Sequence, residues 1–95
     1  MFRIYVTFRA FEGKREAFVE ALKKEGILAA IRAEDGCKMY DFYYSEKDEN
    51  ELLLVEAWES RRHQEIHMTQ EHMARFRILK GNYIESSHLG EFDLK

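Results

Sequence analysis

Two histidines and one isolated carboxylate are the side chains in this sequence best suited to proton chemistry. His67 and His72 flank the expected junction of two short helices, where a cleft can open, and Glu56 interrupts an apolar run. Histidine titrates near neutral pH, and a carboxylate in apolar surroundings has a raised pKa. We therefore take His67 and His72 as catalytic candidates that would hydrogen-bond to a substrate or remove its proton.

Glu56 has two interpretations. It shares a strand face with Trp58, two residues further along. It can form an ion pair with an arginine such as Arg9 or Arg75, or it can serve in a pocket as an acid or hydrogen-bond acceptor. Trp58 suits the core in either case, and its indole N–H needs a partner when it is buried.

Metal binding and nucleophilic catalysis have little support in the sequence. His67 and His72 are five residues apart, which separates them by about 140° on a continuous helix. A break near Thr69 would be needed to bring them together, and the i, i+4 pair of His63 and His67 lacks a third ligand. Cys37 has no His or Asn partner at a readable spacing. We expect no metal and no cofactor.

Periodic patterns predict the elements that position these residues. Strict alternation indicates a strand over residues 2–10, with Thr7 on its more polar face. A helical pattern runs from about residue 14 to 33, with a kink or local loosening expected at Gly26, and ends at a turn that suits Gly36. Strands over 37–44 and 51–59, joined by a polar turn, form an antiparallel hairpin.

The last third of the chain predicts two helices and a strand. Ser60 is a suitable N-cap for a helix over 61–67, and Thr69 for a second over about 70–79, which residues 81–82 end. A strand over 83–92 follows, with Gly90 at a bulge or at its end. The order β-α-β-β-α-β is that of an α+β, ferredoxin-like fold with an antiparallel sheet.

A chain of 95 residues forms one domain, over 1–95, and buries only about 60–65% of its unfolded surface. Its single cysteine excludes an internal disulfide, so oligomerisation is the remaining way to stabilise a small core. The strand over 51–59 is apolar on both faces, with Leu52 and Leu54 on one and Leu53 and Val55 on the other. We expect a second copy to cover the face that the helices leave bare, giving a homodimer.

Charge and hydropathy argue against nucleic acid and membranes as partners. The formal net charge is -3, with acidic and basic residues interspersed, which argues against a nucleic-acid surface. No apolar run approaches the roughly 20 residues that cross a bilayer, so we expect no membrane contact. No signal-peptide pattern follows Met1, and one free cysteine suits a reducing cytoplasm.

Three segments together resemble a known family. EDGCKMY (34–40), EAWES (56–60) and HMTQEH (67–72) are similar, in order and spacing, to the antibiotic biosynthesis monooxygenase (ABM) domain family, and most of all to members described as quinol monooxygenases. The resemblance spans nearly the entire chain. It implies a ferredoxin-like protomer that forms a dimeric α/β barrel, in agreement with the argument from the two apolar strand faces.

The resemblance also implies a function. Some members oxygenate small aromatic or quinol-type substrates without metal, flavin or haem, because the deprotonated substrate itself activates dioxygen. By this analogy Trp58 would form a wall of the pocket, and Tyr40, Thr7 and Glu56 would bind and orient the substrate. His67 or His72 would hydrogen-bond to it or deprotonate it.

Other branches of the family leave alternatives open. The haem-degrading branch uses an Asn on the first strand and a Trp on the helix, where this sequence has Thr7 and His67. That departure argues against haem oxygenation. Another branch isomerises a phosphorylated sugar derivative in the same cleft, and a non-catalytic ligand-binding module is the third alternative.

Overall fold

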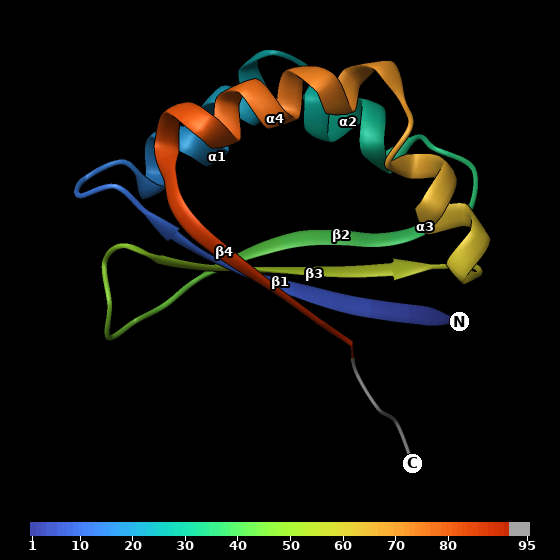
Figure 1. The fold of residues 1–95 in the computed structure, drawn as a ribbon, viewed down its shortest axis with the longest axis horizontal. Helices are drawn as coiled ribbons and strands as arrows, with labels where there is room; N and C mark the ends of the chain where they lie inside the picture. The colour runs from blue at the N-terminus through green and yellow to red at the C-terminus, as the bar shows by residue number, and fades with distance from the viewer. Residues whose placement is uncertain (92–95) are drawn as a thin grey trace.

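The computed structural model describes residues 1–91. In this range the chain forms two layers, a four-stranded antiparallel sheet and a layer of helices that covers one of its faces (Figure 1). The elements in chain order are β1 (Phe2–Ala10), α1 (Arg15–Lys24), α2 (Ile27–Arg32), β2 (Cys37–Tyr44), β3 (Glu51–Trp58), α3 (Arg61–His67), α4 (Glu71–Tyr83) and β4 (Ile84–Glu91). The predicted ferredoxin-like α+β fold is confirmed.

The sheet order β2-β3-β1-β4 places β1 and β3 at its centre. Ile4 lies opposite Glu56 in the β1–β3 register, so the inner face of β3 carries Glu56 and Trp58 toward the helices. The core between the layers contains fully buried side chains from β1, α1, α2, β2 and β3: Ile4, Phe18, Leu22, Ile31, Tyr40, Leu52, Leu54 and Trp58.

The first helical segment differs from the prediction, because it is two helices. Gly26 adopts a left-handed conformation with φ of 75°, which ends α1 and begins α2. A residue with a Cβ atom rarely adopts this conformation, so glycine allows the break. Gly36, with φ of 81°, makes the left-handed turn that the sequence predicts before β2.

The region after β3 contains one confirmed cap and two corrections. Ser60 accepts a hydrogen bond from the His63 backbone N–H and caps α3 as predicted. Thr69 is not the cap of α4, since Gln70 occupies that position and the Thr69 hydroxyl instead donates to the Ile66 carbonyl. Residues 81–82 do not end α4, which continues to Tyr83 because its backbone hydrogen bonds run on through the glycine.

The strand boundaries also shift slightly. β3 ends at Trp58 rather than at residue 59, and β4 begins at Ile84. The irregularity in the β1–β4 pairing lies between Arg9 and Ala10, so Gly90 is not a bulge but a regular partner of Tyr5. The predicted end of β4 at residue 92 lies outside the described residues.

The outer face of the sheet has no helix over it within residues 1–91 (Figure 1). Leu53 and Val55 of β3 are half-buried there, and Tyr43 of β2 is 49% exposed. The expected second apolar face of the sheet is therefore present. No helix in the described range is long and apolar enough to cross a membrane.

Candidate active site

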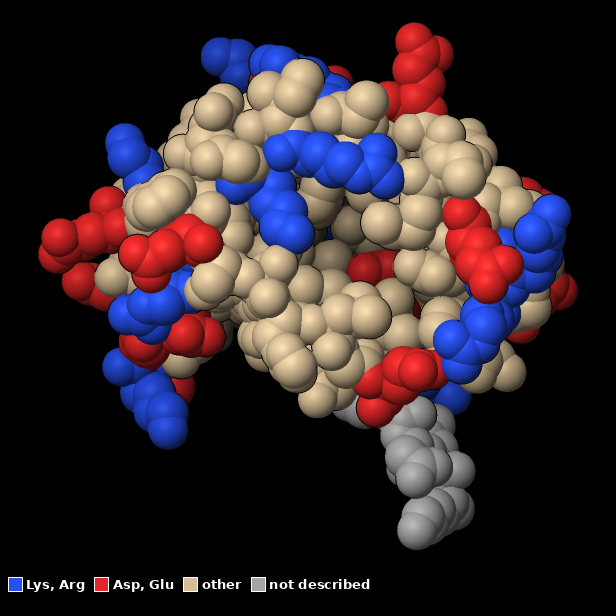
Figure 2. Space-filling view, in the orientation of Figure 1, with Lys and Arg blue, Asp and Glu red and all other residues tan. Residues whose placement is uncertain are grey.

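A cavity of about 240 Å³ lies between the inner face of the sheet and helices α3 and α4. Figure 2 shows this side of the molecule hollowed between the two layers, with acidic side-chain atoms visible inside the hollow. Most of the lining is apolar, from residues such as Val6, Leu54 and Phe76. The titratable groups that line it are Tyr40, Glu56, His67 and Lys80.

Glu56 is 5% exposed and faces this cavity from β3. Its Oε1 accepts a hydrogen bond of 3.0 Å from the indole Nε1 of Trp58, which is fully buried. Removal from water raises the pKa of Glu56 to about 7; the hydrogen bond from Trp58 opposes this rise, and the charge of Glu34 adds to it.

The arginine interpretation of Glu56 is wrong. Arg9 lies on the other face of the sheet and pairs with Asp48 and Glu51. Arg75 pairs with Glu25. Glu56 therefore has the environment of the second interpretation, a pocket carboxylate that holds or accepts a proton near neutral pH.

His67 ends α3 and is 1% exposed. Its ring lies against Trp58 with a centroid distance of 4.5 Å and an interplanar angle of 33°, and Tyr40 meets it edge-on at 5.7 Å. Its Nδ1 is hydrogen-bonded to Glu34 Oε2 at 2.8 Å. Desolvation lowers the pKa of His67, while Glu34 opposes that shift, so the imidazole is held neutral at pH 7.

With Nδ1–H donating to Glu34, the other ring nitrogen, Nε2, carries a lone pair. Because His67 lines the cavity and Glu34 does not, this nitrogen is suited to accept a hydrogen bond or proton from a bound molecule.

His72 does not line the cavity. Its Nε2 lies 2.7 Å from the same Glu34 Oε2 that contacts His67. The break between α3 and α4 thus brings the two histidines together, as the sequence allowed for a junction near Thr69. His72 takes the position of a support for Glu34 and, through it, for His67.

Tyr40 is 2% exposed on β2 and lines the same cavity. Burial, with a smaller contribution from the Glu56 charge, raises the pKa of its phenol well above the ordinary value, so the hydroxyl stays protonated and can donate a hydrogen bond. The structure therefore brings together four of the predicted site residues: Tyr40, Glu56, Trp58 and His67.

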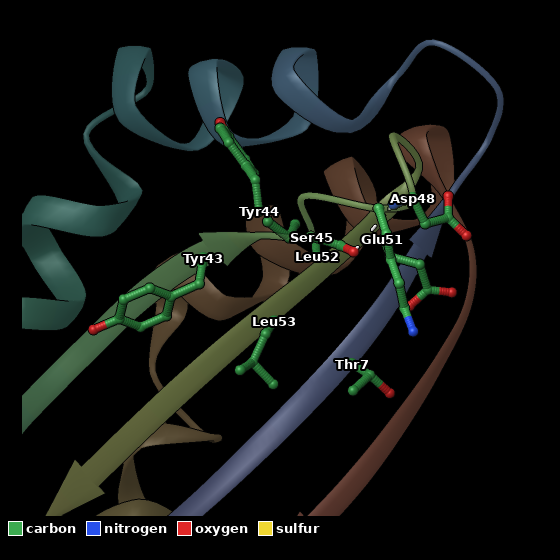
Figure 3. A pocket seen from close by; sticks show the side chains of 9 residues that line it. Thr7, Tyr43, Tyr44, Ser45, Asp48, Glu51, Leu52 and Leu53 are labelled. Atoms are coloured by element: carbon green, nitrogen blue, oxygen red, sulfur yellow. Dashed lines mark hydrogen bonds between the residues drawn. The ribbon is translucent and has the colours of Figure 1, made fainter.

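Thr7 lies on the opposite face of the sheet. Figure 3 shows it with Leu53 and Tyr43, directed away from the helices, around an open depression of about 540 Å³. Its hydroxyl donates a long hydrogen bond of 3.4 Å to the His88 carbonyl. This depression is wider than the inner cavity, but its acidic groups Asp48 and Glu51 are already paired with Arg9. A role for Thr7 stays a prediction.

Two residues escaped the sequence reasoning. Glu34 has no predicted role, although its position inside EDGCKMY, one of the three motif segments, is an available signal. Lys80 lies on α4 and reaches the cavity, with its Nζ 5.9 Å from the ring centroid of Phe8. Nothing in the sequence marked this lysine among 15 lysines and arginines.

A sequence profile described as "Antibiotic biosynthesis monooxygenase" (ABM) matches residues 1–78. The chain belongs to this family. The matched range extends from β1 through most of α4. It contains all the residues that line the inner cavity except Lys80 in the last turn of α4 and Ser87 and Leu89 in β4. No curated protein sequence matches the chain.

Solved structures share the fold of this chain. The protein PA3566 from Pseudomonas aeruginosa has a TM-score of 0.84 at 24% identity, covering 99% of this chain and 93% of its own. Rv0793 from Mycobacterium tuberculosis has a TM-score of 0.81 at 26% identity, covering 99% and 94%. A Bacteroides thetaiotaomicron protein described as a possible oxidoreductase has a TM-score of 0.79 at 26% identity, covering 96% of each chain.

Proposed function

We propose that this ABM protein is a monooxygenase that oxidises a small aromatic, quinol-type substrate in the inner cavity without a bound cofactor. The observation that supports this most is the convergence of Glu56, His67 and Tyr40 on one apolar cavity. Drug-sized pockets hold about 300–1,000 Å³, so a cavity of about 240 Å³ favours a compact one- or two-ring molecule.

The proposed reaction begins with deprotonation of the substrate. Nε2 of neutral His67, or ionised Glu56, takes the phenolic proton of the quinol, and Tyr40 donates a hydrogen bond to the resulting oxyanion. Lys80, the one lysine among the residues that line the cavity, adds a positive charge that favours the anion. Trp58 holds both bases in place through its hydrogen bond to Glu56 and its contact with His67.

The electron-rich anion then reduces dioxygen directly. One oxygen atom is inserted into a C–H bond of the ring and the other leaves as water, so that hydroquinone and O₂ give a hydroxyquinone and H₂O. The four electrons come from the substrate, and dioxygen is the oxidant. The largely apolar lining of the cavity limits side reactions of the intermediate with water.

We expect oxygen consumption with a panel of small hydroquinones, and a loss of kcat/KM of at least about 100-fold in Glu56→Gln or His67→Ala, the usual contribution of a positioned acid or base. Glu49→Gln, at an exposed carboxylate that does not line the cavity, is the matched control and should retain the activity. Absence of turnover across the panel would contradict the proposal, as would conversion that continues without oxygen, which would indicate an isomerase.

We also propose a homodimer formed through the outer face of the sheet, where Leu53 and Val55 lie without a covering helix. Light scattering at micromolar concentration should give twice the chain mass of 11.4 kDa. Leu53→Asp should give the monomer mass, because the dimer would bury the new charge.

The control for the dimer is Ile78→Asp, which places the same charge at a 53% exposed position on α4. It should leave the dimer intact. A wild-type mass of 11.4 kDa would contradict the dimer, and dissociation by Ile78→Asp instead of Leu53→Asp would place the interface on the helical layer.

A further inference from the structure

Glu34, His67 and His72 form a three-residue cluster, of which only His67 lines the inner cavity. Glu34 lies in the turn between α2 and β2, His67 ends α3, and His72 lies in the first turn of α4. Their candidate ligand atoms all lie within 4.8 Å of one another. We propose that these residues form a binding site for a divalent transition-metal ion such as Zn²⁺.

The donor set fits such an ion. Two imidazole nitrogens and one carboxylate oxygen are ligands that zinc and its first-row neighbours accept, with a further position open to water. The atoms are Glu34 Oε2, His67 Nδ1 and His72 Nε2, with the carboxylate oxygen 2.8 Å and 2.7 Å from the two nitrogens.

Metal binding needs little movement. A metal ion about 2.0–2.1 Å from each donor holds neighbouring donors about 2.9–3.4 Å apart. The two oxygen–nitrogen distances therefore have to widen by a few tenths of an ångström as the ion takes the place of the shared protons, and the two nitrogens already lie within 4.8 Å of each other. The His67 nitrogen would lose the proton it donates to Glu34, and its remaining proton would sit on Nε2, so that in the metal-bound protein Glu56 would be the base of the proposed reaction.

The charge balance also favours a cation. The Glu34 side chain is 9% exposed, and within residues 1–91 its ion-pair partners are these two histidines, with no lysine or arginine. A largely buried carboxylate is costly unless a positive charge compensates it. A divalent ion supplies that charge at the point where the two nitrogens already converge.

The cluster is rigid yet accessible. The His67 side chain is 1% exposed and is fixed between Trp58 and Tyr40, which predetermines the direction of its Nδ1. His72 is 23% exposed and gives an ion a route from solvent. Preorganised donors with one solvent-facing ligand are what a site for an exchangeable metal requires.

A second cluster provides an internal control. Asp35, Glu59 and His63 also place three candidate donors within reach of one another. Their side chains are 96%, 58% and 25% exposed, so water satisfies the carboxylates and no charge needs compensation. We expect Zn²⁺ to prefer the Glu34 cluster.

The test uses the full-length protein after removal of metals with a chelator. Titration with Zn²⁺ by calorimetry, and with Co²⁺ by visible absorption, should show one site per chain. His72→Ala and Glu34→Gln should each weaken binding at least about tenfold, since even outer-shell partners alter metal affinity by 10–100-fold. His63→Ala should bind as the wild type does.

Two outcomes would overturn the proposal. One is equal affinity in the wild type and in His72→Ala, whose partly exposed position makes it the variant most certain to fold. The other is loss of binding in His63→Ala. Nitrogen-15 NMR gives a separate readout, because Zn²⁺ at Nδ1 should shift the His67 ring signals, and unchanged signals at saturating Zn²⁺ would also refute the site.

Discussion

At pH 8 we expect the Glu56→Gln variant to be more stable to unfolding than the wild-type protein by about 3 kcal/mol, and at pH 4 to differ little from it. Burial raises the pKa of Glu56 from its ordinary value of 4.5 to about 7 in the folded protein. Each unit of pKa difference between folded and unfolded states corresponds to about 1.4 kcal/mol of stability.

The direction follows from proton binding. Between pH 4.5 and about 7, the folded protein keeps a proton on Glu56 that the unfolded chain has lost. The free energy of unfolding therefore falls as pH rises through this window and is constant for this group above it. Glutamine is neutral at every pH and can still accept the Trp58 hydrogen bond, so the variant does not suffer this loss.

The comparison isolates Glu56 from the groups around it. Glu34 acts on it electrostatically, and Tyr40, His67 and Lys80 line the same cavity. The lowered pKa of His67 acts in the opposite direction. It makes the free energy of unfolding decrease as the pH falls below the pKa that histidine has in the unfolded chain. Taking the difference between variant and wild type at each pH largely removes these contributions.

The measurement is urea unfolding at a series of pH values from 4 to 8. Glu49→Gln, at an exposed carboxylate, is the matched control and should change the free energy of unfolding by less than about 0.5 kcal/mol at every pH. A difference between Glu56→Gln and wild type that stays flat across the range would mean that Glu56 titrates as an exposed carboxylate does.

The fold was predictable because its signals are local. Alternation in β1, the apolar run of β3 and the turn at Gly36 indicate where these elements lie, and these patterns depend on a few neighbouring residues. The misplaced boundaries have a different cause. Backbone hydrogen bonding carries α4 through Gly81, and tertiary packing of the helix overrides the weak preference of that residue.

The site was only partly predictable, because it depends on contacts between distant segments. Strand periodicity correctly places Glu56 on one face with Trp58, and the family resemblance assigns His67 and Tyr40 to one pocket. The partner of both histidines, Glu34, lies more than 30 positions away, and no local pattern links them. The same limit applies to Thr7, where periodicity assigns it to the polar face but the resemblance assigns it to the pocket of Tyr40.

Trp58 should be the most damaging single position in the protein to truncate. It is fully buried, and replacing a buried tryptophan with alanine costs about 3–5 kcal/mol, a large part of the roughly 5–15 kcal/mol that stabilises a domain. The loss also removes the donor to Glu56 and the ring against His67.

Trp58→Phe separates these effects. Phenylalanine retains most of the apolar contact but has no N–H, so the cost should fall to about 1–3 kcal/mol, the usual range for an unsatisfied buried group. Because the Trp58 hydrogen bond lowers the pKa of Glu56, its loss should move that pKa further above 7. Unfolding in urea gives the stability, and carbon-13 NMR of the glutamate carboxyls gives the titration.

Phe18→Ala is the control that removes a large buried side chain without changing the candidate active site. Phe18 is also fully buried, but it packs against Phe8, Phe42 and Phe76 instead of the carboxylate. It should destabilise the protein by a similar amount and leave the titration of Glu56 unchanged. If Glu56 titrates identically in Trp58→Phe and in the wild type, the indole is not its donor, and the electrostatics of the cavity must come from burial alone.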